Sequence, residues 1–353
     1  MKGVREILSK ARNALYRMIL APSYLDVVAP LVSSLPASLA YGAARTYGDA
    51  RFMIDRLQRE EIDTCVERLL AKEISREERK RIVRDIFRMR ACFKVDPMLF
   101  SGDGRSIKRL TTIRGLEHVR TALAGGRGAI LCTAHYGGAK TCVGLLGLLG
   151  LPVSSVMAWS FHPEQFKGES EQPFYLLMQR PMAKHLRRPV IRVRTGGTNP
   201  EWNLGVAVEI SSSLRRNELV CIHLDVGTES SDRKKAVTMD FLGAKATLQP
   251  GALRIAKLVG SPVLTMILRR AGDGRRLVLE FSPPMEVSDE IAAFRHCLDL
   301  IEATIRLEPA PWELWRMRRL VQLGLIPEAD AIRFFNGKGK RWNLIREQTG
   351  PLH

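Results

Sequence analysis

Residues 111–140, TTIRGLEHVRTALAGGRGAILCTAHYGGAK, contain the pattern change that decides the fold. A helical stretch ends in a Gly-rich turn, and the short apolar run that follows is typical of a buried strand. His135 comes directly after this run, in a loop that also holds Gly137 and Gly138. Ligands of open α/β sheets bind at the carboxyl ends of the strands. His135 is therefore the first candidate functional residue.

From residue 127 onward, short apolar runs alternate with helical stretches. Strands are predicted at 127–134, 152–157, 189–193, 218–224 and 262–268, and helices near 138–149, 172–186, 203–216 and 249–260. This alternation predicts an α/β fold in which helices flank a mostly parallel sheet. Residues 276–282 are expected to add an antiparallel edge strand. Helices starting near Asp289 and at Pro311 are expected to close the domain.

The chain divides into three predicted regions. Residues 1–110 are a helical N-terminal region, residues 111–335 the α/β core, and residues 336–353 a polar, loosely held tail. Ser75 and Glu78 match a capping box at the start of a helix. Between residues 2 and 19, apolar side chains recur at helical spacing with basic residues largely off that stripe. This segment predicts an amphipathic helix, which either lies on an anionic membrane surface or docks on its own domain.

Composition favours an anionic partner and a reducing compartment. The 353 residues carry a formal net charge of +18, and 45% of them are hydrophobic, enough for a sizeable core. The six cysteines show no metal-binding or disulfide spacing, and Cys132 and Cys221 lie in apolar runs typical of a reduced core. The charge alone would also suit nucleic acid, but no nucleic-acid-binding module is recognisable. A peripheral protein on the inner face of the cytoplasmic membrane is expected.

The chain resembles the bacterial lipid A biosynthesis acyltransferases, a family of the lysophospholipid acyltransferase superfamily. Besides residues 111–140, the resemblance rests on Asp225-Val-Gly227, Phe241-Leu-Gly243 and Pro311-Trp-Glu-Leu-Trp315, in this order. It implies transfer of an acyl group from an acyl-carrier-protein or CoA thioester. The acceptor would be a hydroxyl or amine on a lipid, glycolipid or lipopeptide-type metabolite. His135 would act as general base, with no metal and no bound cofactor.

One position departs from the family pattern. The family places Glu or Asp after His and four further residues, whereas this chain has Lys140 there. An ammonium at that place would oppose the charged imidazole that a base forms. Another carboxylate can replace the missing acid, and Asp225 is the leading candidate because it ends a neighbouring predicted strand.

The lysine at position 140 also leaves two alternatives open. An amine acceptor or an unusual donor would let a weaker base suffice, with Lys140 holding a substrate phosphate or carboxylate. Alternatively, catalysis is lost and the fold binds an acyl chain or a carrier protein. Either way, the changed motif favours a specialised pathway over housekeeping lipid A synthesis.

The remaining candidates fall into two groups around the predicted dyad of His135 and Asp225. Binding of the thioester oxyanion or of an anionic headgroup is predicted for Gly137, Gly138, Lys140, Arg192, Arg194 and Arg269. Contact with the acceptor is predicted for the loop that holds Gly227 and Glu229. Glycines let a ligand approach the backbone closely, and guanidinium groups pair with phosphates.

Overall fold

The computed structural model describes residues 27–158, 185, 191–193, 200–227, 236–270, 275–340 and 342. The predicted helices at 2–19 and 172–186 lie outside, or almost outside, these residues. The first described part is helical, as predicted. It comprises α2 (Ala29–Ser34), α3 (Ala37–Ile54), α4 (Arg56–Leu70), α5 (Arg76–Val95), the 3₁₀ turn η3 (Asp96–Phe100) and α6 (Arg105–Leu110). At the start of α5, the Ser75 hydroxyl accepts a hydrogen bond of 3.1 Å from the Glu78 N–H, which confirms the predicted cap.

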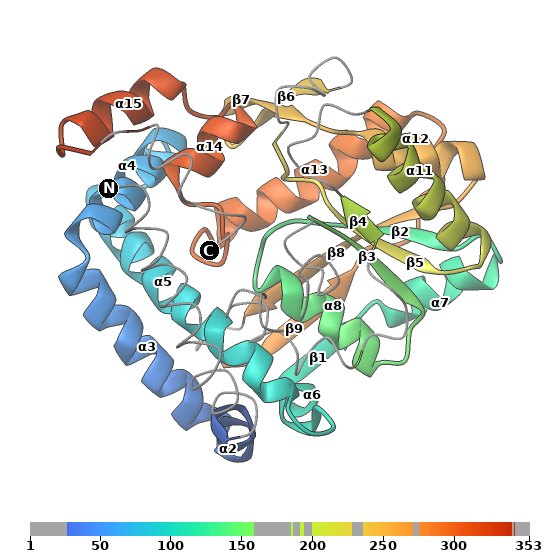
Figure 1. Ribbon diagram of the computed structural model, residues 1–353, viewed down its shortest axis with the longest axis horizontal. Coiled ribbons are helices and arrows are strands. Elements are labelled where there is room, and N and C mark those ends of the chain that lie inside the picture. Colours follow the sequence, from blue (N-terminus) through green and yellow to red (C-terminus); the bar gives the residue numbers. More distant parts are fainter. Residues whose placement is uncertain are drawn as a thin grey trace, which may run out of the picture.

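A seven-stranded sheet forms the centre of the molecule (Figure 1). Its strands are β1 (Thr111–Arg114), β2 (Ala129–Thr133), β3 (Val153–Ala158), β4 (Ile191–Val193), β5 (Leu219–His223), β8 (Val263–Arg270) and β9 (Leu277–Phe281). They lie in the order β1-β9-β8-β2-β5-β3-β4. The five strands from β8 to β4 are mutually parallel, whereas β9 runs antiparallel to β8. The predicted α/β class with a mostly parallel sheet is confirmed.

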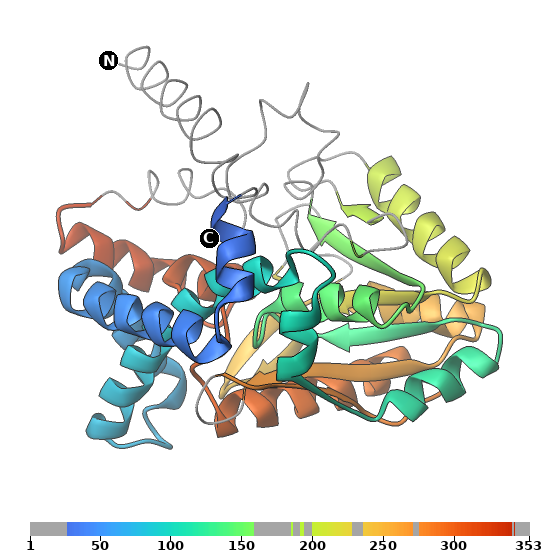
Figure 2. The ribbon, with the colours of Figure 1, turned by 90° about the horizontal axis from the view of Figure 1, so that it is seen from below.

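Helices cover both faces of the sheet, as Figure 2 shows. One face packs against α7 (Leu116–Ala124) and α8 (Ala139–Leu148). The other face packs against α11 (Pro200–Arg215), α12 (Gly251–Val259) and α13 (Glu290–Leu307). All five residues of β2 are buried, which explains why its sequence is apolar without alternation.

The structure corrects two predicted elements and adds a third. The strand β9 is antiparallel as predicted but is not at the edge, because β1 pairs outside it. A two-stranded hairpin of β6 (Val237–Phe241) and β7 (Ala244–Leu248), which had not been predicted, stands apart from the main sheet. No helix begins at Pro311: the next helices are α14 (Met317–Leu323) and α15 (Glu328–Asn336). Residues 311–316 instead run as a loop that contacts the site described below.

The C-terminal tail contains a packed residue. Trp342 is only 3% exposed, and its ring stacks on Phe335 of α15 with the centroids 5.5 Å apart. Its indole N–H also donates to Glu328 Oε1 at 2.9 Å. This part of the predicted loose tail is therefore held by apolar packing. Within the described ranges, no helix combines the length and the apolar character that crossing a membrane would require.

Candidate active site

The site is built where two neighbouring parallel strands end. In the register of β2 and β5, Thr133 lies opposite His223, so the loops that begin with His135 and Asp225 leave the sheet side by side. The Nδ1 atom of His135 is 2.8 Å from Asp225 Oδ1. The backbone N–H of His135 also donates to this carboxylate, at 3.0 Å to Oδ1 and 2.9 Å to Oδ2. The structure thus brings together the two residues predicted as a dyad.

Asp225 is buried but well supplied with donors. Its carboxylate is fully shielded from solvent, and Oδ2 also accepts from a third donor group, the indole N–H of Trp312, at 2.9 Å. Burial alone would raise the pKa of Asp225, but the charge and hydrogen bond of His135 and the bond from Trp312 outweigh it, so the pKa falls. Asp225 is therefore an anion that holds His135 by Nδ1. The Nε2 atom of His135 makes no hydrogen bond to any described residue.

The loop after His135 depends on its two glycines. Gly137 has φ +69°, and a Cβ there would lie 1.7 Å from the carbonyl oxygen of Leu268. The Gly137 N–H donates to the Pro311 carbonyl at 3.0 Å, so this amide is already engaged. Gly138, with φ +99°, precedes α8, and its N–H has no partner among the described residues. Of the two glycines predicted in the oxyanion or headgroup site, Gly138 is therefore the one whose amide has no partner among the described residues.

Glu313 braces this loop and had not been singled out in the sequence. Its N–H donates to the His135 carbonyl at 2.8 Å, and its Oε1 accepts from the Ala139 N–H at 2.8 Å. Lys140 lies in the first turn of α8, where the helix dipole disfavours a cation. Burial lowers the pKa of Lys140 to about 8, and the charge of Glu313 opposes that shift. Lys140 is thus a desolvated amine close to a carboxylate.

A second histidine packs against the first. The rings of His135 and His223 stack with centroids 4.5 Å apart and planes inclined by 30°. Burial lowers the pKa of His223 to about 3, and the positive charges of His135 and Lys140 act in the same direction. The buried Nε2 of His223 has no hydrogen-bond partner in the described part of the chain. His223 therefore presents a neutral ring to His135, a contact that its place at the end of β5 did not reveal.

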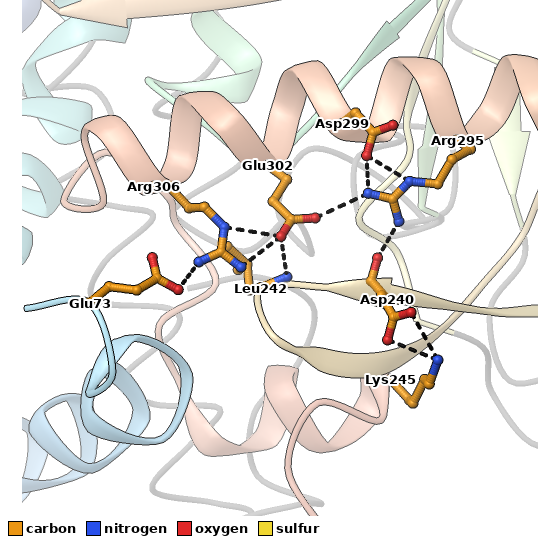
Figure 3. A network of polar contacts seen from close by, with 8 residues as sticks. All are labelled: Glu73, Asp240, Leu242, Lys245, Arg295, Asp299, Glu302 and Arg306. Carbon is orange, nitrogen blue, oxygen red and sulfur yellow. Dashed lines mark hydrogen bonds and ion pairs between the residues drawn. The ribbon is translucent and has the colours of Figure 1, made fainter.

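A polar network joins α13 to the β6–β7 hairpin (Figure 3). Glu302 of α13 accepts from the backbone N–H of Leu242 in the hairpin turn at 3.0 Å and pairs with Arg306 at 2.8 Å. Arg306 also contacts Glu73, which precedes α5. The hairpin in turn positions Phe241, whose ring meets the Trp312 ring edge to face at 6.1 Å. The network therefore supports the indole that binds Asp225.

The other residues predicted from the sequence form no hydrogen bond or ion pair with His135 or Asp225 in the described part of the chain. Arg269 lies 3.5 Å from a carboxylate oxygen of Glu308 and 3.7 Å from one of Glu280, so its charge is already partnered. Gly227 makes an isolated bridge to Leu248, which joins the acceptor-side loop to the hairpin. Arg192 lies on β4, and nothing further is described of it; Arg194 and Glu229 are outside the described residues.

A buried arginine next to Arg269 had also escaped prediction. Arg270 pairs with Asp96, and both side chains are at most 1% exposed. Asp96 further accepts from the hydroxyl of Tyr41 at 2.8 Å and from that of Thr141 at 3.1 Å. Thr141 follows Lys140 in α8, so this network fastens the N-terminal helices to the helix that follows the His135 loop. The sequence offered one signal for this buried ion pair, which is an arginine at the end of an apolar strand.

Comparison with known proteins identifies the family of the chain. Residues 16–148 and 204–321 match the family described as bacterial lipid A biosynthesis acyltransferase. Both halves of the site lie inside the matched segments, His135 in the first and Asp225 and Trp312 in the second. No curated protein matches the chain.

Proposed function

Because the chain belongs to the bacterial lipid A biosynthesis acyltransferase family, we propose that it transfers an acyl group from a thioester to a hydroxyl or amine on a lipid, glycolipid or lipopeptide-type acceptor. The donor is an acyl carrier protein or CoA thioester. The observation that carries the proposal is the 2.8 Å contact between His135 Nδ1 and the buried Asp225 carboxylate. Asp225 supplies, from another strand, the acid that Lys140 has displaced.

The proposed reaction depends on which nitrogen of the His135 ring carries the proton. Asp225 keeps the proton of neutral His135 on Nδ1, so the lone pair is on Nε2. Nε2 accepts the proton of the acceptor O–H or N–H while the acceptor oxygen or nitrogen attacks the thioester carbonyl. The tetrahedral intermediate places its negative charge near the Gly138 N–H at the start of α8. Its collapse breaks the C–S bond, and the thiolate leaves with the proton held by His135.

Lys140 has a binding role in this proposal. A partly desolvated amine with a pKa of about 8 is largely charged at neutral pH and suits an anionic group on the substrate. Replacing Lys140 with Ala is expected to raise the KM for a phosphate- or carboxylate-bearing acceptor more than it lowers kcat. Steady-state kinetics with the acceptor varied would measure both, and a loss confined to kcat would contradict the assignment.

We also propose that the protein works peripherally at the inner face of the cytoplasmic membrane. Support comes from α2 and α3, where Val28, Leu31, Leu35 and Leu39 are 40–60% exposed. Four large apolar side chains exposed along α2 and the start of α3 are costly to leave in water and would lower their free energy among acyl chains. Flotation with anionic vesicles would measure this association.

Mass spectrometry of the reaction products tests the proposed activity. Purified protein would be incubated with an acyl-carrier thioester and with an acyl-CoA, each with lipid and amine acceptors. His135→Ala is expected to abolish product formation, and Asp225→Asn to lower kcat by roughly three orders of magnitude or more. The exposed Asp103→Asn is the matched control and is expected to act like the unaltered protein. Donor binding without turnover for any acceptor would instead favour a binding protein that has lost catalysis.

A further inference from the structure

A large groove in the helical region carries an excess of positive charge. It encloses about 1060 Å³ and lies between α3, α4, α5 and α15, which Figure 1 shows together at one side of the sheet. Nine of its lining residues are arginine or lysine, and three are aspartate or glutamate. We call it the basic groove. Six of these nine basic residues form ion pairs within the described part of the chain, and the proposed acyl transfer uses none of the nine.

The basic residues of α5 recur at a fixed spacing. Arg76, Lys80, Arg84 and Arg88 all line the groove, four residues apart. At 1.5 Å of rise per residue, neighbouring charges are about 6 Å apart along the axis, and the row is about 18 Å long. A row of this kind matches another helix that carries carboxylates at the same four-residue spacing.

Part of this row is neutralised within the chain, and part is not. Arg84 and Arg88 share the carboxylate of Asp49, at 2.7 and 2.8 Å. Arg76 and Lys80 are exposed and form no ion pair with any described residue. Arg76 and Lys80, which we call the outer end of the row, therefore have charge available to a partner. Arg84 and Arg88, the inner end, are already held in place by Asp49.

Apolar side chains flank the row. Phe52 of α3 and Phe334 of α15 both line the groove and are partly buried against the core. Arg59 lies over the Phe52 ring at 5.4 Å, and Lys338 over the Phe334 ring at 6.0 Å. A partner helix would thus meet apolar contacts beside the charges, as expected for a helix laid into a groove.

We propose that the basic groove docks an acidic helix of an acyl carrier protein that delivers the thioester. This inference rests on the proposed function and specifies its donor. A flat membrane surface has no ridge to fill a groove of this volume. The phosphates of free CoA are clustered, and do not form a row of charges at helical spacing. Charge complementarity therefore favours an acidic helix over both.

The groove and the site share a helix. Arg90, six residues or about 9 Å beyond Arg84 along α5, donates to the Trp315 carbonyl at 3.0 Å. The Trp315 ring packs edge to face on Trp312 at 4.9 Å, and Trp312 binds Asp225. A carrier docked in the groove would therefore lie beside the structural frame of the dyad.

Charge reversal at the outer end of the row tests the proposal. In the variant Arg76→Glu with Lys80→Glu, glutamate keeps helix propensity at both positions and suits the first turn of α5 at position 76, so folding should be preserved. Arg120→Glu with Arg276→Glu, at exposed sites outside the groove, is the control with the same change of net charge. Fluorescence anisotropy would measure binding of labelled holo-acyl carrier protein, and kinetics would compare carrier-borne and small-molecule thioesters.

The groove variant is expected to weaken carrier binding by about tenfold or more and to raise the KM for the carrier-borne donor equally. Turnover of the small thioester should stay unchanged. Equal carrier affinity for both double variants would overturn the proposal, as would loss of binding to phosphatidylglycerol vesicles without loss of carrier binding. Because the binding measurement needs no turnover, an inactive protein that still binds the carrier through the groove would contradict the proposed function alone.

Discussion

At the scale of single residues, Gly137 is required by its surroundings as well as by its backbone. Alanine there would combine φ +69° with a Cβ 1.7 Å from the Leu268 carbonyl oxygen. We expect Gly137→Ala to lower the free energy of unfolding by about 3 kcal/mol or more, because backbone strain adds to a clash with main-chain atoms. Urea denaturation would measure the change.

Gly102→Ala separates the two causes. Gly102 has nearly the same φ, +67°, but a Cβ there would meet nothing within 4 Å. Strain alone should cost about 1–2 kcal/mol. If both variants lost the same stability, the steric account of Gly137 would be wrong.

His223 makes folding sensitive to acid. Its pKa is about 3 in the folded chain against 6.5 ordinarily, so below pH 6.5 the unfolded chain takes up a proton that the folded chain refuses. The free energy of unfolding should then fall as pH drops from about 6.5 toward 3, by roughly 1.4 kcal/mol per pH unit. His223→Phe keeps a ring against His135 but cannot titrate, and should show a shallower decline between pH 6.5 and 4.5.

The exposed His296 provides the control for this measurement. His296→Gln should leave the pH dependence of urea unfolding as it is in the unaltered protein. A slope for His223→Phe equal to that of the unaltered protein would exclude His223 as its source.

At the scale of elements, the Asp96–Arg270 pair joins four pieces of structure. Asp96 of η3 contacts Tyr41 of α3, Thr141 of α8 and Arg270 of β8. Removing one charge leaves the other buried without its counter-ion. We therefore expect Asp96→Asn to cost about 3–5 kcal/mol of unfolding free energy in thermal or urea melts.

Two further variants test whether the unpaired charge causes this loss. Asp96→Leu combined with Arg270→Met removes both charges and should recover much of the lost stability. Asp299→Asn, in a pair with 55% of the Asp299 side chain exposed, should cost less than about 1 kcal/mol. A double variant less stable than Asp96→Asn would show that packing, rather than the unpaired charge, causes the loss.

The elements also show which patterns predict structure. Strands β2, β5 and β8 were predicted because burial on both faces makes them continuously apolar. In β1, partly buried and exposed residues alternate over only four positions, too short a pattern to stand out. A helix was predicted from Pro311, whereas the structure has a loop there. This loop is held by long-range hydrogen bonds to His135 and Gly137, which local periodicity does not record.

At the scale of the whole molecule, the cysteines lie in the core, where thiols are expected to be unreactive. All six are free and buried. Because a thiol reagent needs access to a thiolate, the native protein should react with it only slowly, whereas the denatured protein should titrate six thiols. Fast reaction of any cysteine in the native protein would show that part of the core opens readily. The number of thiols titrated in the denatured protein should be the same whether or not the protein has first been reduced.

The sequence by itself determined the α/β class, the family and the position of His135, because these depend on local periodicity and on the order of short motifs. It also nominated Asp225, from its place at the end of a strand. Only the tertiary structure decided that these two residues meet, since they are 90 positions apart and the pairing of β2 with β5 brings them together. The bracing by Glu313, the neutral His223 ring and the basic groove likewise arise from contacts between distant segments, whose geometry no local pattern encodes.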